Sequence, residues 1–204
     1  MQKPAPTAHP IHDLLKNRWS PRAFSARPVE TESILSLFEA ARWSPSGGNS
    51  QPWAFILTFQ SDPEPFGRLL STLGERNQLW AKHAPVLVLT ITNSEREPGK
   101  PNPWATYDLG QAVAHLSIQA SALGISVHQM AGFDRQKARE AFNLPDGFDP
   151  VTVFTLGYDG EPDTLPGEIR EREIGPRVRK PLGEFVFNGA WKEPILREET
   201  IPIK

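Results

Sequence analysis

The chain contains no cysteine in its 204 residues. This absence excludes disulfide bonds, thiolate metal sites and a cysteine nucleophile, and it is compatible with a reducing compartment. No apolar run approaches the roughly 20 residues that cross a bilayer, and the first ten residues, MQKPAPTAHP, lack the apolar core of a signal peptide. We therefore expect a soluble, cytoplasmic protein whose fold rests on packing or on oligomerisation.

An excess of charge of one sign is also missing, since the formal net charge is -2. Without a basic field, the sequence predicts neither nucleic-acid binding nor membrane binding, and it favours a small-molecule partner. The five histidines form no ligand spacing such as H-E-x-x-H with nearby carboxylates, and no G-x-S-x-G elbow occurs. Neither a metal site nor a serine hydrolase is predicted.

Hydrophobic residues make up 38% of the chain, which is enough to build the core of one domain. Helical periodicity is clearest over Thr31–Arg42 and Ala105–Leu123, and Gly124 follows in a C-cap position. Continuous apolar runs are typical of strands covered on both faces, and we place the first run in the centre of the sheet. Strands are expected at Trp53–Phe59, Pro85–Thr92, Ile125–Met130 and Val151–Tyr158, with further helices near Ile11–Lys16, Glu64–Leu73 and Asp134–Phe142. This alternation predicts an α/β or α+β sandwich with a mixed sheet.

Two segments lack a core pattern. Ser94–Pro103 holds three prolines and alternating charges, which indicates a surface connection rather than a packed element. Gly160–Pro181 is rich in Pro, Glu and Arg and has no apolar period, which predicts a wrapping arm. We therefore predict a single domain over residues 1–204, with residues 160–204 as an extended C-terminal arm. Sparse apolar anchors follow along this arm at Phe185, Val186, Phe187, Trp191, Ile195, Leu196, Ile201 and Ile203.

The run WSPSGGNSQPW, from Trp43 to Trp53, joins a helical pattern to an apolar strand pattern. Its prolines fix the backbone at both ends, its glycines allow close backbone approach, and its Ser, Asn and Gln side chains supply donors and acceptors. An ordinary connection has a similar composition, because glycine and proline punctuate most loops. The run is therefore a candidate ligand loop whose support must come from the rest of the chain.

Arginine alternates with other residues in the segment Arg18–Phe24. In an extended backbone, Arg18, Ser20 and Arg22 share one face, where two guanidinium groups and a hydroxyl suit a phosphate monoester. A second alternating basic group, Arg177 and Arg179, would complete the same anion site. Each cluster alone is also typical of a solvated basic surface. The pairing of the two clusters is what indicates an anion site.

These motifs together resemble the FMN-dependent nitroreductase family over nearly the whole sequence. The resemblance rests on R-x-S-x-R-x-F at 18–24, SPSGGNSQPW at 44–53 and Asn77 ahead of the HAPVLVLTI strand. In the same order follow D-x-G-Q-A at 108–112, ALG at 122–124, AGF at 131–133, LGY at 156–158 and RKPLGEFV at 179–186. The resemblance implies a three-layer α+β sandwich with a mixed, mainly antiparallel central sheet. It also implies an NAD(P)H-dependent FMN oxidoreductase that reduces nitroaromatics, quinones or similar electron-poor acceptors in two half-reactions.

The resemblance further implies a homodimer with FMN at its interface and with C-terminal arms exchanged between subunits. Arg18, Ser20 and Arg22 would hold the ribityl phosphate and one edge of the ring system. Arg177 and Arg179 would join them at the phosphate. Basic charge near the N1 and O2 edge would stabilise the anionic reduced flavin.

Other cofactor contacts implied by the family come from small or polar residues. Asn77 would bond the pyrimidine part of the ring, and Ala131 and Gly132 would present backbone groups near N5 and O4, where close approach needs small residues. A loop of the partner subunit would lie against the flavin through Pro45, Ser46, Gly48 and Asn49. No acid or base side chain is required, because the flavin carries the chemistry.

The sequence departs from the family pattern in two places. A lysine often found a few residues after the asparagine has no counterpart, because Leu79 and Trp80 stand there, and we interpret Trp80 as packing on the cofactor. Trp80, Trp104 and Tyr107 are candidate pocket walls. The short Ser94–Pro103 segment leaves the substrate preference open. The sequence also leaves open the choice between NADH and NADPH. Two alternative functions remain: a flavin-dependent reductase of an activated alkene or semialdehyde, and a non-catalytic flavin-binding sensor or carrier.

Overall fold

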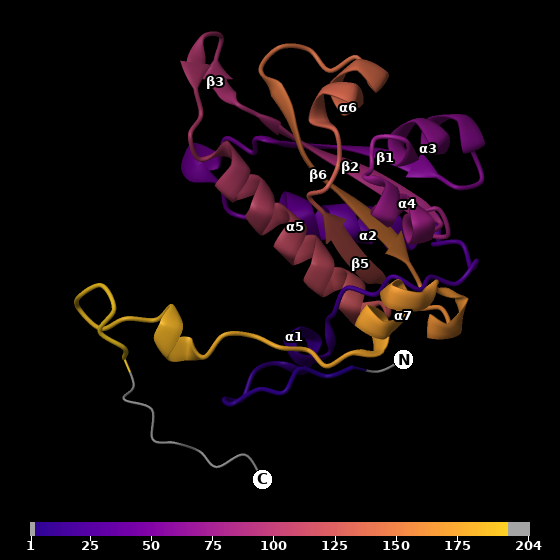
Figure 1. Cartoon of the computed structure of the whole chain (residues 1–204). Coiled ribbons are helices and arrows are strands. Elements are labelled where there is room, and N and C mark those ends of the chain that lie inside the picture. Colours follow the sequence, from indigo (N-terminus) through magenta and orange to yellow (C-terminus); the bar gives the residue numbers. More distant parts are fainter. Residues whose placement is uncertain (1–2, 196–204) are drawn as a thin grey trace.

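The computed structural model describes residues 3–195, and the predicted anchors Leu196, Ile201 and Ile203 lie outside this range. Figure 1 shows a sheet with helices on both sides and a C-terminal segment that extends away from the body of the molecule. Among the described residues, no helix is both long and apolar enough to cross a membrane.

The main sheet has the strand order β1-β2-β6-β5, and each neighbouring pair is antiparallel. The strands are β1 (Trp53–Phe59), β2 (Val86–Asn93), β5 (Ser126–Met130) and β6 (Phe148–Gly157). In β2, alternate side chains enter different cores, because successive residues of a strand point to opposite faces. Val86 and Val88 contribute to one hydrophobic cluster, whereas Leu87 and Leu89 contribute to the other.

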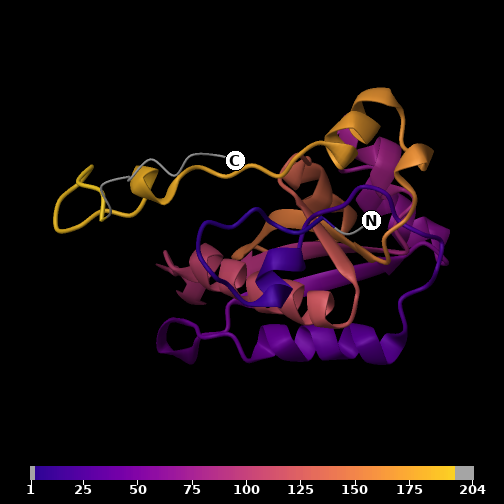
Figure 2. The same cartoon turned by 90° about the horizontal axis from the view of Figure 1, so that it is seen from below.

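Helices cover both faces and complete three layers. One face carries α2 (Thr31–Arg42) and α5 (Ala105–Ala122), which pack against each other and bury Leu37, Leu109 and Leu116. Figure 2 shows α2 on one side of the sheet and α7 (Gly167–Ile174) on the other. The second face also carries α3 (Pro63–Leu70), α4 (Glu75–Ala81) and α6 (Arg135–Ala141). The short helix α1 (Asp13–Asn17) lies near the last turn of α5. The predicted α+β sandwich is confirmed, without a parallel strand pair in the described part.

The predicted position of Trp53–Phe59 in the sheet centre is wrong, because β1 is an edge strand. Helices cover its two faces, and this explains its continuous apolar pattern. A side-chain pattern reports the faces of a strand, whereas hydrogen bonding to a neighbour involves the backbone edge. The pattern therefore predicted the strand correctly and its order in the sheet incorrectly.

The segment Ser94–Pro103 is a β-hairpin rather than an unstructured connection. It contains β3 (Glu95–Glu97) and β4 (Lys100–Pro101), with Gly99 in the left-handed region between them at φ 76°. Its base is fixed because Ser94 N donates to Gly147 O over 2.8 Å. The prolines and charges correctly predicted a surface segment, but they gave no indication of the short β3–β4 pairing.

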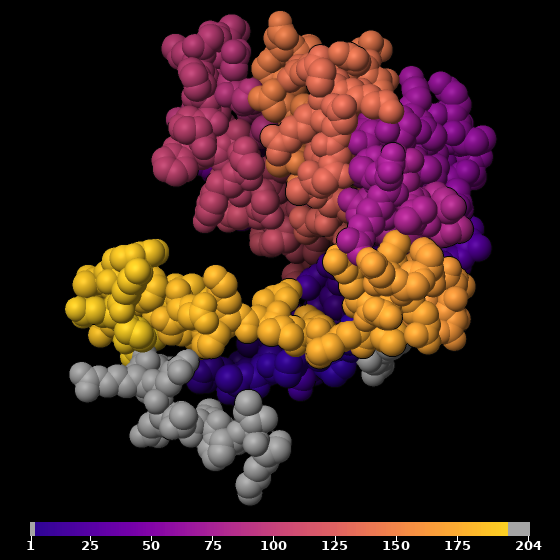
Figure 3. All heavy atoms as spheres, in the orientation of Figure 1, coloured from indigo at the N-terminus to yellow at the C-terminus, as the bar shows by residue number. Residues whose placement is uncertain are grey.

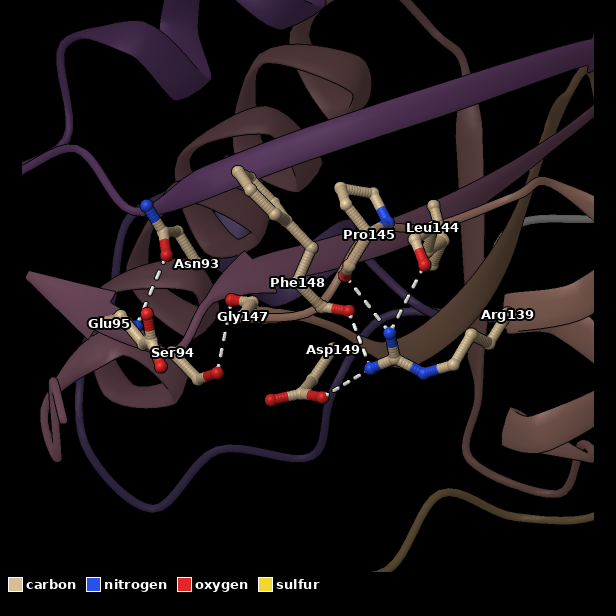
Figure 4. A network of polar contacts seen from close by, with 9 residues as sticks. All are labelled: Asn93, Ser94, Glu95, Arg139, Leu144, Pro145, Gly147, Phe148 and Asp149. Atoms are coloured by element: carbon tan, nitrogen blue, oxygen red, sulfur yellow. Dashed lines mark hydrogen bonds and ion pairs between the residues drawn. The ribbon is translucent and has the colours of Figure 1, made fainter. Parts of the chain in front are cut away.

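Figure 4 shows how Arg139 orders the connection from α6 to β6, next to that hairpin. Its guanidinium donates to the main-chain oxygens of Leu144, Pro145 and Phe148 and forms an ion pair with Asp149 at 2.7 Å. One planar cation thus bonds three carbonyl groups, two in the connection and one at the first residue of β6.

The segment after Gly160 differs from the predicted arm in its first half. Leu165 and Ile169 are buried in the core of the same chain, and α7 also buries Glu173. Beyond α7 the chain extends away from the body, beside the N-terminal segment (Figures 1 and 3). Along this part Val178, Phe185, Trp191 and Ile195 remain exposed. The boundary of the arm therefore lies after α7, and its packing on a partner subunit stays a prediction.

Gly160 lies where the segment Arg18–Phe24 crosses the end of β6. An added Cβ would lie 2.6 Å from the carbonyl carbon of Phe24 and 2.9 Å from Ser25 N. We expect Gly160→Ala to lower the free energy of unfolding by about 2–3 kcal/mol, because backbone atoms must shift. Urea unfolding at constant m-value measures this. The control is Gly67→Ala in α3, where a Cβ meets nothing within 4 Å. A neutral Gly160→Ala variant would contradict the expected crowding.

Candidate functional site

The two predicted arginine clusters meet in the structure at one cleft of about 330 Å³. Arg18, Ser20 and Arg22 line it from the N-terminal segment, and Arg177 and Arg179 line it from the C-terminal segment. The Arg18 guanidinium donates to Ser20 Oγ over 3.3 Å. Lys3 and Arg172, which the sequence did not single out, add two further cations to the lining. The cleft therefore assembles a donor set suited to a phosphate group.

Arg177 has a structural role at this cleft. Its guanidinium donates to the main-chain oxygens of Lys3, Lys16 and Arg18, at 2.7, 3.0 and 2.9 Å. These bonds tie the C-terminal segment to the N-terminal segment and so position Arg18. Arg179 is exposed and donates only to Val178 O among the described residues. Its guanidinium is thus the more available of the two for a ligand.

Glu173, at the end of α7, holds the backbone of the basic segment. Its Oε1 accepts from Arg22 N over 2.8 Å and from Ala23 N over 3.1 Å. Sequence reasoning missed this residue, because a single glutamate in a charged helix shows no sign that it will be buried. Only the docking of α7 against residues 22–23 reveals its role.

The electrostatics of the cleft favour an anion. Burial lowers the pKa of Arg18, and the like charges of Arg177 and Arg179 lower it further. The pKa of Lys3 is also lowered, first by burial and then by Arg177 and Arg22, although Glu173 acts in the opposite direction. A lowered pKa means that the folded chain disfavours these positive charges. A bound phosphate would offset that cost.

A second part of the candidate site lies where α4 meets the end of β5. Asn77 Nδ2 donates to Gly132 O over 3.4 Å, and Gly74 N donates to the same oxygen over 3.0 Å. An added Cβ on Gly132 would lie 3.4 Å from Asn77 Nδ2, so the position leaves little room for a side chain. Ala131 is exposed beside it. The structure thus brings together the predicted residues Asn77, Ala131 and Gly132.

Trp80 does not line a pocket, which contradicts its interpretation as a cofactor contact. It is only 1% exposed and stacks on Phe24 at a centroid distance of 6.3 Å. The ring of His128 also lies beside it, at a centroid distance of 4.5 Å. Leu79, at the adjacent position of α4, is the exposed residue instead. A helix turns by about 100° per residue, so the sequence could not show which of the two faces inward.

His128 supports the basic segment from β5, since its Nδ1 lies 2.8 Å from Pro21 O. Burial lowers the pKa of His128 from its ordinary 6.5 to about 4, and the charges of Arg22 and Arg18 act in the same direction. The unfolded chain therefore binds this proton more readily than the folded chain between those two pH values. The contribution of neutral His128 to the free energy of unfolding is therefore fully present above pH 6.5.

We expect this stabilisation to be lost as the pH falls from about 6.5 to about 4. The loss should be about 3 kcal/mol of unfolding free energy, because the two pKa values differ by about 2.5 and each unit of difference corresponds to about 1.4 kcal/mol. Urea unfolding across this range should show that His128→Gln has a flatter pH dependence than the unmodified chain. Parallel pH profiles for the two proteins would show that another group is responsible.

The loop Trp43–Trp53 is bonded to the first turn and the middle of α5, away from the end of the helix that lies near the basic segment. Gly47 N donates to the buried carboxylate of Asp108 over 3.0 Å, and Ser44 Oγ lies 3.0 Å from His115 Nδ1. Gly48, Asn49 and Gln51 have positive φ values of 61°, 55° and 46°. Left-handed residues other than glycine are strained, and such strain concentrates at functional sites. The loop is therefore a preformed surface feature rather than a slack connection.

Within one chain, this loop and the basic cleft do not meet. The loop contacts Asp108 in the first turn of α5, whereas Ser121 in the last turn donates to Leu14 O beside the basic segment. The helix axis between Asp108 and Ser121 is about 20 Å long. Pro45, Ser46, Gly48 and Asn49 thus lie far from Arg18, Ser20 and Arg22. The structure separates the predicted site into two groups.

The comparisons with known proteins assign the family. The model of the nitroreductase family matches residues 15–158. The chain belongs to the nitroreductase family. A crystal structure of an oxidoreductase containing FMN is 34% identical to this chain, with a TM-score of 0.87, and the match covers 93% of this chain and 96% of that one.

Other relatives agree with this assignment. A nitroreductase family structure from Clostridium difficile is 26% identical with a TM-score of 0.69, covering 87% of this chain and 97% of that one. An uncharacterised 15.4 kDa protein of Mycolicibacterium smegmatis is 36% identical over 62% of this chain and 84% of its own length. A Rhodopseudomonas palustris protein, provisionally named NADH dehydrogenase/NAD(P)H nitroreductase, is 26% identical over 83% of this chain and 95% of its own. The family resemblance is confirmed.

Proposed function

We propose that the protein is an FMN-dependent oxidoreductase that uses NADH or NADPH to reduce nitroaromatics, quinones or similar electron-poor acceptors. The active unit is a homodimer with two FMN sites at its interface. The observation that carries the proposal is the division of the site between the two ends of α5. A second copy can bring the loop around Gly47 to the cleft that Arg18 lines. The relatives named for FMN and for NAD(P)H support the choice of cofactor and co-substrate.

The residues present fit both the phosphate end and the ring end of FMN. The cleft of Arg18, Ser20 and Arg179 offers guanidinium and hydroxyl donors to the ribityl phosphate, which would relieve the crowding of positive charge. Asn77 offers an amide to the pyrimidine edge, and the exposed backbone at Ala131–Gly132 permits close approach. When bound, FMN would take a hydride from the nicotinamide and pass electrons to the acceptor.

The aromatic residues at the start of α5 suit the acceptor pocket. Trp104 and Tyr107 are 58% and 68% exposed, and they lie at the same end of the helix as the loop anchored by Asp108. We propose that they reach the partner's flavin together with that loop and stack on planar acceptors. The arm after α7 would bury its exposed apolar side chains on the partner, and the enzyme would act in the cytoplasm.

The decisive experiment is anaerobic reconstitution of the purified protein with FMN, followed by NADH or NADPH. We expect one yellow FMN per chain, bleaching of its absorbance by a nicotinamide, and recovery of the absorbance on adding a quinone or a nitroaromatic. Turnover only with an activated alkene or a semialdehyde would favour that alternative. Bound FMN that neither nicotinamide reduces would indicate a sensor or carrier. A folded dimer that does not bind FMN would contradict the proposal.

A further inference from the structure

Glu173, near the C-terminal end of α7, is a buried acidic side chain that contacts Arg22, one of the arginines of the basic cleft. Its side chain is 1% exposed, and its Oε2 lies 3.5 Å from the Arg22 guanidinium, which is 26% exposed. Oε1 accepts two backbone N–H groups, from Arg22 and Ala23. Oε2 has no hydrogen-bond partner in the described structure. One carboxylate therefore contacts both the backbone and the cation of the same arginine.

A buried carboxylate is costly, and a hydrophobic residue of similar size is often at least as stabilising at such a position. The surroundings nevertheless hold Glu173 firmly. Lys3 Nζ donates to its main-chain oxygen, and Arg177, four residues later, is bonded to the N-terminal segment through three carbonyl groups. The end of α7 is thus fixed to the cleft on two sides. This placement suggests that the charge has a use beyond stability.

We propose that Glu173 is a positioning residue of the flavin site: it fixes the backbone at Arg22 and offsets part of the Arg22 charge. This proposal rests on the proposed function. Positive charge beside the ring stabilises the anionic reduced flavin. By pairing with Arg22, Glu173 weakens that effect and keeps the midpoint potential of the bound FMN lower than the arginine cluster alone would set it.

The substitution Glu173→Gln separates the two roles, because an amide oxygen still accepts the backbone N–H groups while the negative charge is gone. We expect the midpoint potential of bound FMN to become more positive. The dissociation constant of FMN should change by less than about threefold, since the lost negative charge favours the phosphate while the looser Arg22 disfavours it. Glu173→Ala also removes the backbone acceptor, and we expect it to weaken FMN binding about tenfold, or about 1.4 kcal/mol.

A double-mutant cycle tests whether Glu173 acts through Arg22. In an Arg22→Gln background, Glu173→Gln should shift the potential much less than in the unmodified protein. The matched control is Glu168→Gln, which removes a charge from the exposed face of the same helix, where Glu168 pairs with Arg76. Thermal unfolding of each apoprotein shows whether a variant folds. If Glu173→Ala fails to fold, the midpoint potentials of Glu173→Gln in the two backgrounds still test the proposal.

The outcomes distinguish this inference from the proposed function. An unmodified protein that binds no FMN would overturn the proposed function and this inference with it. An unmodified protein that binds and cycles FMN, beside a Glu173→Gln variant of unchanged potential, would overturn the inference alone. A shift of the same size in the Arg22→Gln background would show a direct effect of the glutamate on the flavin and would contradict action through Arg22.

Discussion

Replacing Arg18 by alanine is expected to weaken FMN binding by about ten- to a hundredfold. A hydrogen bond to a charged group contributes about 1.5–3 kcal/mol, and each 1.4 kcal/mol is a factor of ten in the dissociation constant. Arg18 is suited to such a bond, because Ser20 and the Arg177-bound carbonyl of its own backbone fix it at the cleft. Fluorescence titration of the apoprotein with FMN measures the change.

The apoprotein itself should not be destabilised by this substitution. Burial and two neighbouring guanidinium groups lower the pKa of Arg18, so removing its charge relieves repulsion in the empty cleft. Thermal unfolding without FMN should therefore give a melting temperature equal to or above that of the unmodified protein. The control is Arg170→Ala on α7, where the arginine pairs with Asp163 away from the cleft lining. Equal FMN affinity in Arg18→Ala and the unmodified protein would contradict the assignment of Arg18 to the FMN phosphate.

Much of this site could be predicted from sequence because its residues come in short, regular segments. The alternation of Arg18, Ser20 and Arg22 needs only an extended backbone to bring these side chains to one face. Their meeting with Arg179 was suggested by the two matching charge patterns and strengthened by the family resemblance, because no local rule brings together segments about 160 residues apart. The structure confirms that meeting within one chain.

The residues that sequence reasoning missed act through tertiary contacts. Glu173 is one of three glutamates in the polar helix α7, and it differs from the other two by being buried against the backbone N–H groups of Arg22 and Ala23. Asp108 was recognised as part of a motif, yet its bond to Gly47 N needs the loop and α5 to pack first. Trp80 was placed on the wrong face, since one residue of helical phase separates the core from the surface.

The loop and the cleft can be tested for a shared site with two complementary variants. One chain carries Arg18→Ala, and the other carries Ser46→Ala with Asn49→Gly. The serine change removes the acceptor for Gln51 N, while glycine keeps the left-handed backbone at Asn49 and deletes its side chain. If each flavin lies between the cleft of one chain and the loop of the other, we expect each variant homodimer to lose most of its FMN.

A heterodimer of the two variants should regain about half of the FMN content and activity of the unmodified dimer, because one of its two sites combines an intact cleft with an intact loop. Two different affinity tags isolate this heterodimer, and sedimentation checks that both homodimers and the heterodimer stay dimeric. A site built within one chain gives no recovery, since each chain then carries its own defect.

Larger disruption over 46–49 should weaken FMN binding and dimerisation together, because the rigid loop would contact both the flavin and the partner chain.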